Sequence, residues 1–148
     1  MQAASVEVDV GTGIIKLLNF WVVDDCGRVI NPLLVDEQLR GGAVQGIGAA
    51  LYEVCEYSAE GQILNGNLAD YLVPMASEMP DIDIAHISTL TRSTELGSKG
   101  VGEAGTIGAP GALWTAVNDA LRPLGVQVTR QPFDTQQIVE MLKDRRQN

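Results

Sequence analysis

Residues 96–110 constrain the fold most, because five of them are glycines, at positions 97, 100, 102, 105 and 108. Glycine loses the most backbone entropy when it is ordered, so this density predicts a loop that turns sharply or passes close to another group. Pro110 then predicts the start of a helix, since proline is favoured at the first helical position. A glycine-rich loop before a helix can present backbone N–H groups to an anion. Glu103 is the only acidic side chain of this loop.

Length and composition limit the classes of function. With 148 residues, the chain is expected to form one domain, residues 1–148. A net charge of −9 argues against nucleic-acid binding. Two cysteines and one histidine are too few for a structural zinc site. The sequence has neither a signal peptide nor an apolar run of about 18 residues, so we expect a cytoplasmic protein with no membrane span.

The order of hydrophobic patterns predicts an α+β fold. We expect an N-terminal β-hairpin, a long glycine-rich helix, short strands, the glycine-rich loop and two C-terminal helices. The expected ranges are strands at 6–10 and 14–25, a helix at 33–57, strands at 82–88 and 126–129, a helix at 110–121 and a last helix after Asp134, which caps it.

The helix predicted at 33–57 has an unusual face. At about 100° per residue, Gln38, Gly42 and Gln45 lie on one side, opposite the apolar residues that would form the core. Glycines in a helix cost roughly 1 kcal/mol each relative to alanine. Their presence indicates that a backbone, another helix or a ligand approaches closely, and the sequence leaves these alternatives open.

Two further features have a structural and a chemical interpretation. Asp24 and Asp25 could form a metal or acid–base pair, but in a turn rich in Gly, Asn and Pro they are more often solvated turn residues. His86 stands alone on a predicted strand, where a structural or exposed role is favoured over a chemical one.

The motif at 97–110, Gly-Ser-Lys-Gly-Val-Gly-Glu-Ala-Gly-Thr-Ile-Gly-Ala-Pro, strongly resembles the C-terminal motif of the large subunit of molybdenum hydroxylases. This is the family of xanthine dehydrogenase, aldehyde oxidoreductase and carbon monoxide dehydrogenase. Further family-like blocks occur in the right order, at 25–32, 37–48, 70–74 and 119–125. Several ordered matches are far more specific than one glycine motif. The resemblance covers nearly the whole chain and implies the C-terminal part of a molybdopterin-binding domain.

The resemblance also implies roles for individual residues. Glu103 corresponds to the glutamate that acts as general base beside the molybdenum, in a tight and partly dry pocket that suits proton transfer near neutral pH. Gln38 matches the glutamine whose side chain hydrogen-bonds the pterin, with Gln45 a weaker candidate. Gly42 would give the cofactor room, and the segment formed by Lys99, Gly100, Val101 and Gly102 would line the site mainly through its backbone. No residue of the chain is expected to ligate a metal.

The implied activity is that of a molybdenum-cofactor-dependent oxidoreductase. Such an enzyme would oxidise an aldehyde, an N-heterocycle or a similar small substrate with water as the oxygen source. Its implied partners are the remainder of the large subunit and iron–sulfur and FAD subunits or domains. Because a full large subunit is several times longer, we expect the chain alone to be inactive. The alternatives are a non-catalytic folded module that retains the fold and, less favoured, a generic phosphate-binding protein.

Overall fold

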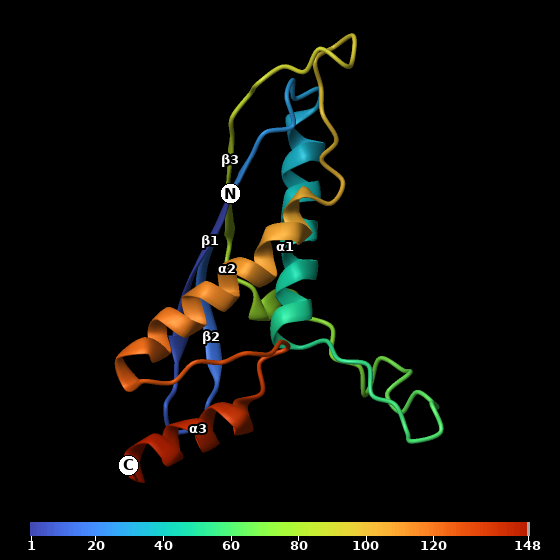
Figure 1. Ribbon diagram of the computed structural model, residues 1–148. Coiled ribbons are helices and arrows are strands. Elements are labelled where there is room, and N and C mark those ends of the chain that lie inside the picture. Colours follow the sequence, from blue (N-terminus) through green and yellow to red (C-terminus); the bar gives the residue numbers. More distant parts are fainter. Residues whose placement is uncertain (148) are drawn as a thin grey trace.

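The computed structural model describes residues 1–147, which form a three-stranded sheet, two long crossing helices and a third helix at one end (Figure 1). The elements are, in chain order, β1 (Gln2–Val8), β2 (Ile15–Asp24), α1 (Pro32–Leu51), the 3-10 helix η1 (Ala76–Glu78), β3 (Ile82–His86), α2 (Ala104–Leu121), the 3-10 helix η2 (Arg122–Leu124) and α3 (Thr135–Gln147). The predicted α+β class is confirmed, with its N-terminal hairpin, long glycine-rich helix and two C-terminal helices.

The sheet has β2 at its centre, with β1 antiparallel on one edge and β3 parallel on the other. The β1–β2 register shifts between Ser5 and Val6, so that Leu18 of β2 is an extra residue, a β-bulge. Leu17 and Phe20 are therefore both buried although they stand three positions apart, where strict alternation would place them on opposite faces. The bulge sets which side of β2 meets the helices.

Helix α1 begins as expected but ends at Leu51 rather than at residue 57. Pro32 occupies its first turn, and the Asn31 side chain caps it by accepting a hydrogen bond from the backbone N–H of Leu34 at 3.4 Å. At the other end, the N–H of Phe133 donates to the Ala50 carbonyl at 2.9 Å. A distant segment thereby takes up one of the carbonyls that a longer helix would have used.

The residues just after α1 hydrogen-bond to a side chain instead of continuing the helix. The Asn65 amide donates to the Val54 carbonyl at 2.7 Å and accepts from the Glu56 N–H at 3.0 Å. Asn65 is the only buried polar residue among those described. The prediction of helix up to residue 57 is wrong because these hydrogen bonds to the Asn65 side chain outcompete the local periodicity.

Helix α2 begins at Ala104, so the prediction that 104–109 belong to a loop is wrong. Pro110 lies inside the helix and not at its start. Proline has no N–H, so it leaves the Thr106 carbonyl without its helical donor. The Gln2 side chain of β1 supports this first turn by donating to the carbonyls of Ala104 at 3.0 Å and Gly105 at 2.8 Å.

Helices α1 and α2 cross at small residues, which explains why glycines are tolerated here. A Cβ at Gly42 would lie 3.1 Å from the Gly105 Cα, and a Cβ at Gly46 would lie 2.7 Å from the Thr106 carbonyl oxygen and 2.8 Å from the Ala109 Cβ. The Thr106 hydroxyl also donates to the Gly42 carbonyl at 3.0 Å. Of the alternatives that the sequence leaves open for this face, close approach by a helix is the one observed at Gly42 and Gly46.

The predicted strand at 126–129 is absent from the described residues, which hold no strand after β3. The Asn118 side chain of α2 accepts from the Val128 N–H at 2.8 Å and donates to its carbonyl at 3.2 Å, as a neighbouring strand would. The expected cap of the last helix is confirmed, since the Asp134 carboxylate accepts from the N–H groups of Gln136 and Gln137.

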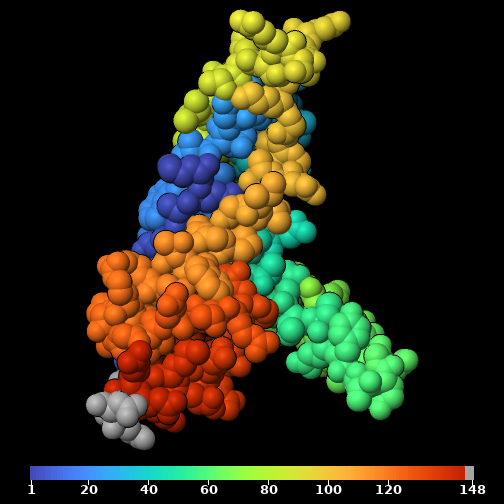
Figure 2. Space-filling model, in the orientation of Figure 1, coloured from blue at the N-terminus to red at the C-terminus, as the bar shows by residue number. Residues whose placement is uncertain are grey.

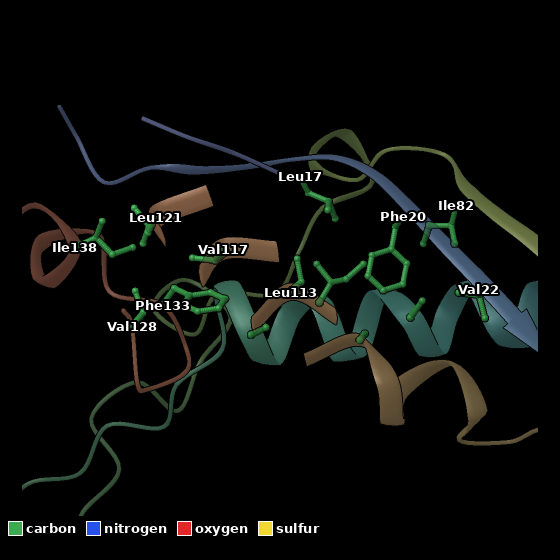
Figure 3. Close-up of a cluster of buried hydrophobic side chains, with 14 of the residues drawn as sticks. Leu17, Phe20, Val22, Ile82, Leu113, Val117, Leu121, Val128, Phe133 and Ile138 are labelled. Atoms are coloured by element: carbon green, nitrogen blue, oxygen red, sulfur yellow. The ribbon is translucent and has the colours of Figure 1, made fainter. Parts of the chain in front are cut away.

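A single apolar core lies between the sheet and the helices (Figure 3). Its fully buried large side chains are Phe20 and Val22 from β2, Leu39 and Ile47 from α1, Leu113, Val117 and Leu121 from α2, and Val128 and Ile138 from the C-terminal region. The core therefore fixes α1 against α2, and the start of α2 is where the glycine-rich loop enters.

Residues 53–75, which we call the arm, project away from this core (Figure 2). The arm exposes many large apolar side chains: Val54, Tyr57, Ile63, Leu64, Leu68, Leu72, Val73 and Met75. Monomeric proteins seldom leave so much apolar surface together, and such surfaces usually mark interfaces. Across residues 1–147, no helix has the length and apolar character of a membrane span.

Candidate functional site

The candidate site lies where the loop at 97–103 enters α2, beside the first half of α1. Glu103 is the N-cap residue of α2. Its backbone carbonyl accepts from the N–H groups of Thr106 at 3.0 Å and Ile107 at 3.2 Å. Its carboxylate is exposed and makes no capping hydrogen bond. Within this chain the expected tight, partly dry pocket is therefore not formed around Glu103, and the carboxylate is free to act on something brought to it.

Gln38 of α1 joins the same site. Its Nε2 donates to the Gly102 carbonyl oxygen at 2.7 Å, directly before Glu103 in the chain. Its Oε1 accepts no hydrogen bond from the described residues. The fold thus brings together the two residues that the sequence motifs suggest for pterin binding and base catalysis, and it leaves an amide acceptor and a carboxylate facing solvent.

Lys99 is turned toward a different part of the loop. Its Nζ lies 3.0 Å from the Asp25 carboxylate and donates to the Thr89 hydroxyl at 2.7 Å, while its N–H donates to the Cys26 carbonyl at 2.7 Å. The side chain is therefore committed to the turn after β2. A contact between Lys99 and a cofactor would have to use its backbone, as the family resemblance implies.

Asp25 is held by several donors, which supports its interpretation as a turn residue. Its carboxylate accepts from the Thr89 hydroxyl, from the N–H groups of Thr89 and Gly27 at 3.0 Å each, and from Lys99. The Thr89 hydroxyl and N–H, followed by Lys99, hold the pKa of Asp25 well below its usual range. Among residues 1–147, no cluster of His, Cys, Asp or Glu could hold a metal ion.

The glycines of the loop divide into two groups. Gly97 of the loop and Gly27 of the turn after β2 adopt left-handed φ angles of 74° and 68°, beside an isolated β-bridge that pairs Gly27 with Ser98, so the two turns themselves require them. Gly100 and Gly102 have no positive φ, and nothing lies within 4 Å of the place where their Cβ atoms would be. The contacts of this chain give no reason for glycine at these two positions. An unhindered backbone there is open to close approach by another group.

The remaining candidates are less exposed to a ligand. Val101 is partly buried against the core, and Gly42 faces Gly105 of α2. The Gln45 Oε1 accepts from the Thr106 hydroxyl at 3.1 Å, so this amide serves the contact between the helices. The sequence motifs did not predict that Thr106 and Gln2 help to position the start of α2. No local pattern indicates that a side chain will hydrogen-bond to another element.

His86 also has a structural partner. Its Nε2 lies 2.6 Å from the Asp36 carboxylate of α1, which links β3 to the helix that carries Gln38. The pairing agrees with the structural interpretation of this histidine.

Comparisons with known proteins identify the family of this chain. The family model described as "Molybdopterin cofactor-binding domain" matches residues 1–80. The chain is 41% identical to the nicotine 6-hydroxylase large subunit of Paenarthrobacter nicotinovorans, over 96% of this chain and 17% of that subunit. It is 32% identical to the carbon monoxide dehydrogenase large chain of Hydrogenophaga pseudoflava, over 94% and 17% of the two chains.

The solved structures give the same result. Quinoline 2-oxidoreductase from Pseudomonas putida 86 superposes with a TM-score of 0.92 at 40% identity, covering 97% of this chain and 18% of that one. A Cu,Mo-CO dehydrogenase superposes with a TM-score of 0.87 at 29% identity, covering 95% and 18%. The chain therefore spans about one sixth of the length of the curated relatives it matches, at 17% for both the nicotine 6-hydroxylase and the carbon monoxide dehydrogenase.

Proposed function

This chain belongs to the molybdopterin cofactor-binding domain family, and we propose that it is the C-terminal part of that domain in the large subunit of a molybdenum hydroxylase. In this proposal residues 1–148 form one domain that contributes one side of the cofactor site. The carrying observation is the hydrogen bond from Gln38 Nε2 to the Gly102 carbonyl at 2.7 Å, which places the amide beside Glu103.

The residues at the site fit a molybdopterin. A pterin edge carries both donors and acceptors, and the Oε1 of Gln38 is free to accept one hydrogen bond. The open backbone at Gly100 and Gly102 leaves room for a flat ring or a metal centre to approach. We assign the cofactor contacts to Gln38 and to the backbone of residues 99–102. Gly42 contributes indirectly, by letting α2 approach α1.

Glu103 is assigned the role of general base. When bound, the molybdenum centre would supply the two-electron oxidation chemistry, with water as the oxygen source. A base must stand within reach of the proton it removes, and the exposed Glu103 carboxylate, which makes no capping hydrogen bond, is open to a group brought to it. The remainder of the subunit would exclude water from Glu103 in the assembled enzyme, because this chain leaves the carboxylate exposed.

We assign the substrate class to aromatic N-heterocycles, ahead of aldehydes and carbon monoxide. The support is that the relatives named nicotine 6-hydroxylase and quinoline 2-oxidoreductase are 41% and 40% identical to this chain, whereas the carbon monoxide dehydrogenases are 32% and 29% identical. Turnover of quinoline or nicotine, compared with benzaldehyde, tests this assignment. Faster oxidation of benzaldehyde would overturn it.

The proposed partners begin with the remainder of the large subunit. The arm supports this proposal, because its large apolar side chains are exposed and resemble an uncovered interface. The arm carries four acidic residues and neither lysine nor arginine, so a covering surface would be apolar with basic groups at its rim. The iron–sulfur and FAD subunits or domains implied by the family complete the proposed complex.

The base assignment is tested by Glu103→Gln in the assembled enzyme. The amide keeps the size of the side chain but cannot take a proton, so we expect bound molybdenum to be retained while kcat falls by about 10²- to 10⁴-fold. Metal analysis and steady-state turnover measure the two effects. Glu95→Gln is the matched control, since Glu95 is an exposed glutamate of the preceding loop. Near-normal turnover of the Glu103 variant would remove the assignment and favour a non-catalytic module.

A further inference from the structure

The segment from Gly100 to Glu103 is fastened at its two ends. On one side, Lys99 is tied to the turn after β2 through the Cys26 carbonyl and the Asp25 carboxylate. On the other side, the Ala104 N–H donates to the Val101 carbonyl at 3.2 Å as α2 begins. Between these anchors, the bond from Gln38 to Gly102 is the only side-chain hydrogen bond that the segment receives from the described residues.

This bond acts on the peptide unit that leads into Glu103. A peptide unit is planar, so holding the Gly102 oxygen also sets the direction of the Glu103 nitrogen and Cα. Gly100 and Gly102 have no side chains to restrain them, and no atoms lie within 4 Å of where a Cβ would be. Without the bond, the glycines would let the peptide unit swivel, because glycine has the widest range of backbone conformations.

We propose that Gln38 is a positioning residue, whose Nε2 aims the Glu103 carboxylate by holding the Gly102 carbonyl while its Oε1 stays available to the cofactor. This inference rests on the proposed function, because it takes Glu103 to be the base. The Gln38 side-chain amide would then contact both the cofactor and the peptide unit that orients Glu103. A ligand that hydrogen-bonds to the Gln38 side-chain amide and shifts it would therefore also shift the peptide unit before Glu103.

The first test uses the chain itself and measures backbone order by NMR relaxation. Gln38→Met keeps the length of the side chain without a donor, and Gln38→Lys keeps a donor without an amide acceptor. We expect the order parameters of Gly102 and Glu103 to fall below about 0.6 in Gln38→Met and to stay near those of the parent chain in Gln38→Lys. Gln45→Met is the matched control on the same face of α1, and it should leave residues 100–103 unchanged.

Two results of this experiment would overturn the inference. One is unchanged order at Gly102 and Glu103 in Gln38→Met. The other is an equal loss of order in Gln45→Met, which would indicate a general effect on α1. Gln38 is exposed, so the core signals of Phe20 and Leu113 should show that each variant remains folded.

The second test separates positioning from cofactor retention in the assembled enzyme. We expect Gln38→Met to lower kcat per bound molybdenum roughly three- to tenfold, the change that corresponds to losing one net hydrogen bond, with KM little changed. A loss of molybdenum with normal kcat per bound molybdenum would overturn the inference, because it would leave Gln38 only a binding role. If the order parameters of residues 102 and 103 fall in Gln38→Met but Glu103→Gln remains active, the proposed function has failed. The role of Gln38 in holding the Gly102 carbonyl would still be supported.

Discussion

At the scale of single residues, the turn after β2 owes its shape to one carboxylate with several donors. Asp25 accepts from Gly27, from Thr89 and from Lys99, and the last two contacts join this turn to a segment more than 60 residues further along the chain. The lowered pKa of Asp25 follows from them, with Thr89 the largest cause. A carboxylate with a lowered pKa stabilises the folded chain above its unfolded pKa of about 3.9, and that contribution is lost as the pH falls through the folded value.

Lys99→Met tests this account at the residue scale. Removing the ammonium should raise the pKa of Asp25, while the Thr89 hydrogen bonds still hold it below the usual range. An NMR titration of the Asp25 carboxyl carbon measures the shift. Lys16→Met, at an exposed lysine of β2, should leave the titration unchanged. An unchanged titration in Lys99→Met would mean that the ion pair does not act on Asp25 in solution.

At the scale of elements, α1 and α2 depend on small residues where they cross. Gly46 lies against the Thr106 carbonyl and Ala109, and Gly42 lies against Gly105. In isolation each glycine weakens its helix by about 1 kcal/mol, but it lets the two backbones pack more closely than any side chain would allow. The start of α2, and with it Glu103, is positioned by this contact.

Two glycines of α1 give a matched test at this scale. In Gly46→Ala the added Cβ would meet the Thr106 oxygen at 2.7 Å, so we expect the free energy of unfolding to fall by about 1–3 kcal/mol. In Gly41→Ala nothing lies within 4 Å, so the helix should gain up to about 1 kcal/mol. Urea unfolding of both variants measures the difference. Equal effects of the two substitutions would contradict the packing argument.

At the scale of the whole molecule, the chain offers one open side of a site and a large uncovered surface. Glu103 and Gln38 face solvent, and the arm exposes apolar side chains well away from the core (Figure 2). The chain also spans only 17% of the nicotine 6-hydroxylase large subunit. We therefore expect tight cofactor binding to need groups that lie outside these 148 residues.

We accordingly expect the purified chain neither to hold stoichiometric molybdenum nor to oxidise quinoline or an aldehyde. Metal analysis and a turnover assay of the chain alone, with the assembled enzyme as the positive control, check this expectation. Stoichiometric molybdenum with turnover would show that the chain has a complete site, and it would contradict the assignment of the remaining contacts to other segments.

The sequence by itself determined the hairpin, the start of α1 to within one residue, the cap of the last helix and the family to which the chain belongs. Each of these depends on nearby residues or on an ordered motif. Only the tertiary structure decided that residues 104–109 are helical, because the cost of Gly105 in a helix is offset by its packing on α1, which no local pattern reveals. It also decided that Gln38 holds the carbonyl before Glu103. That contact depends on where two helices cross, and the crossing is set by long-range packing of small residues.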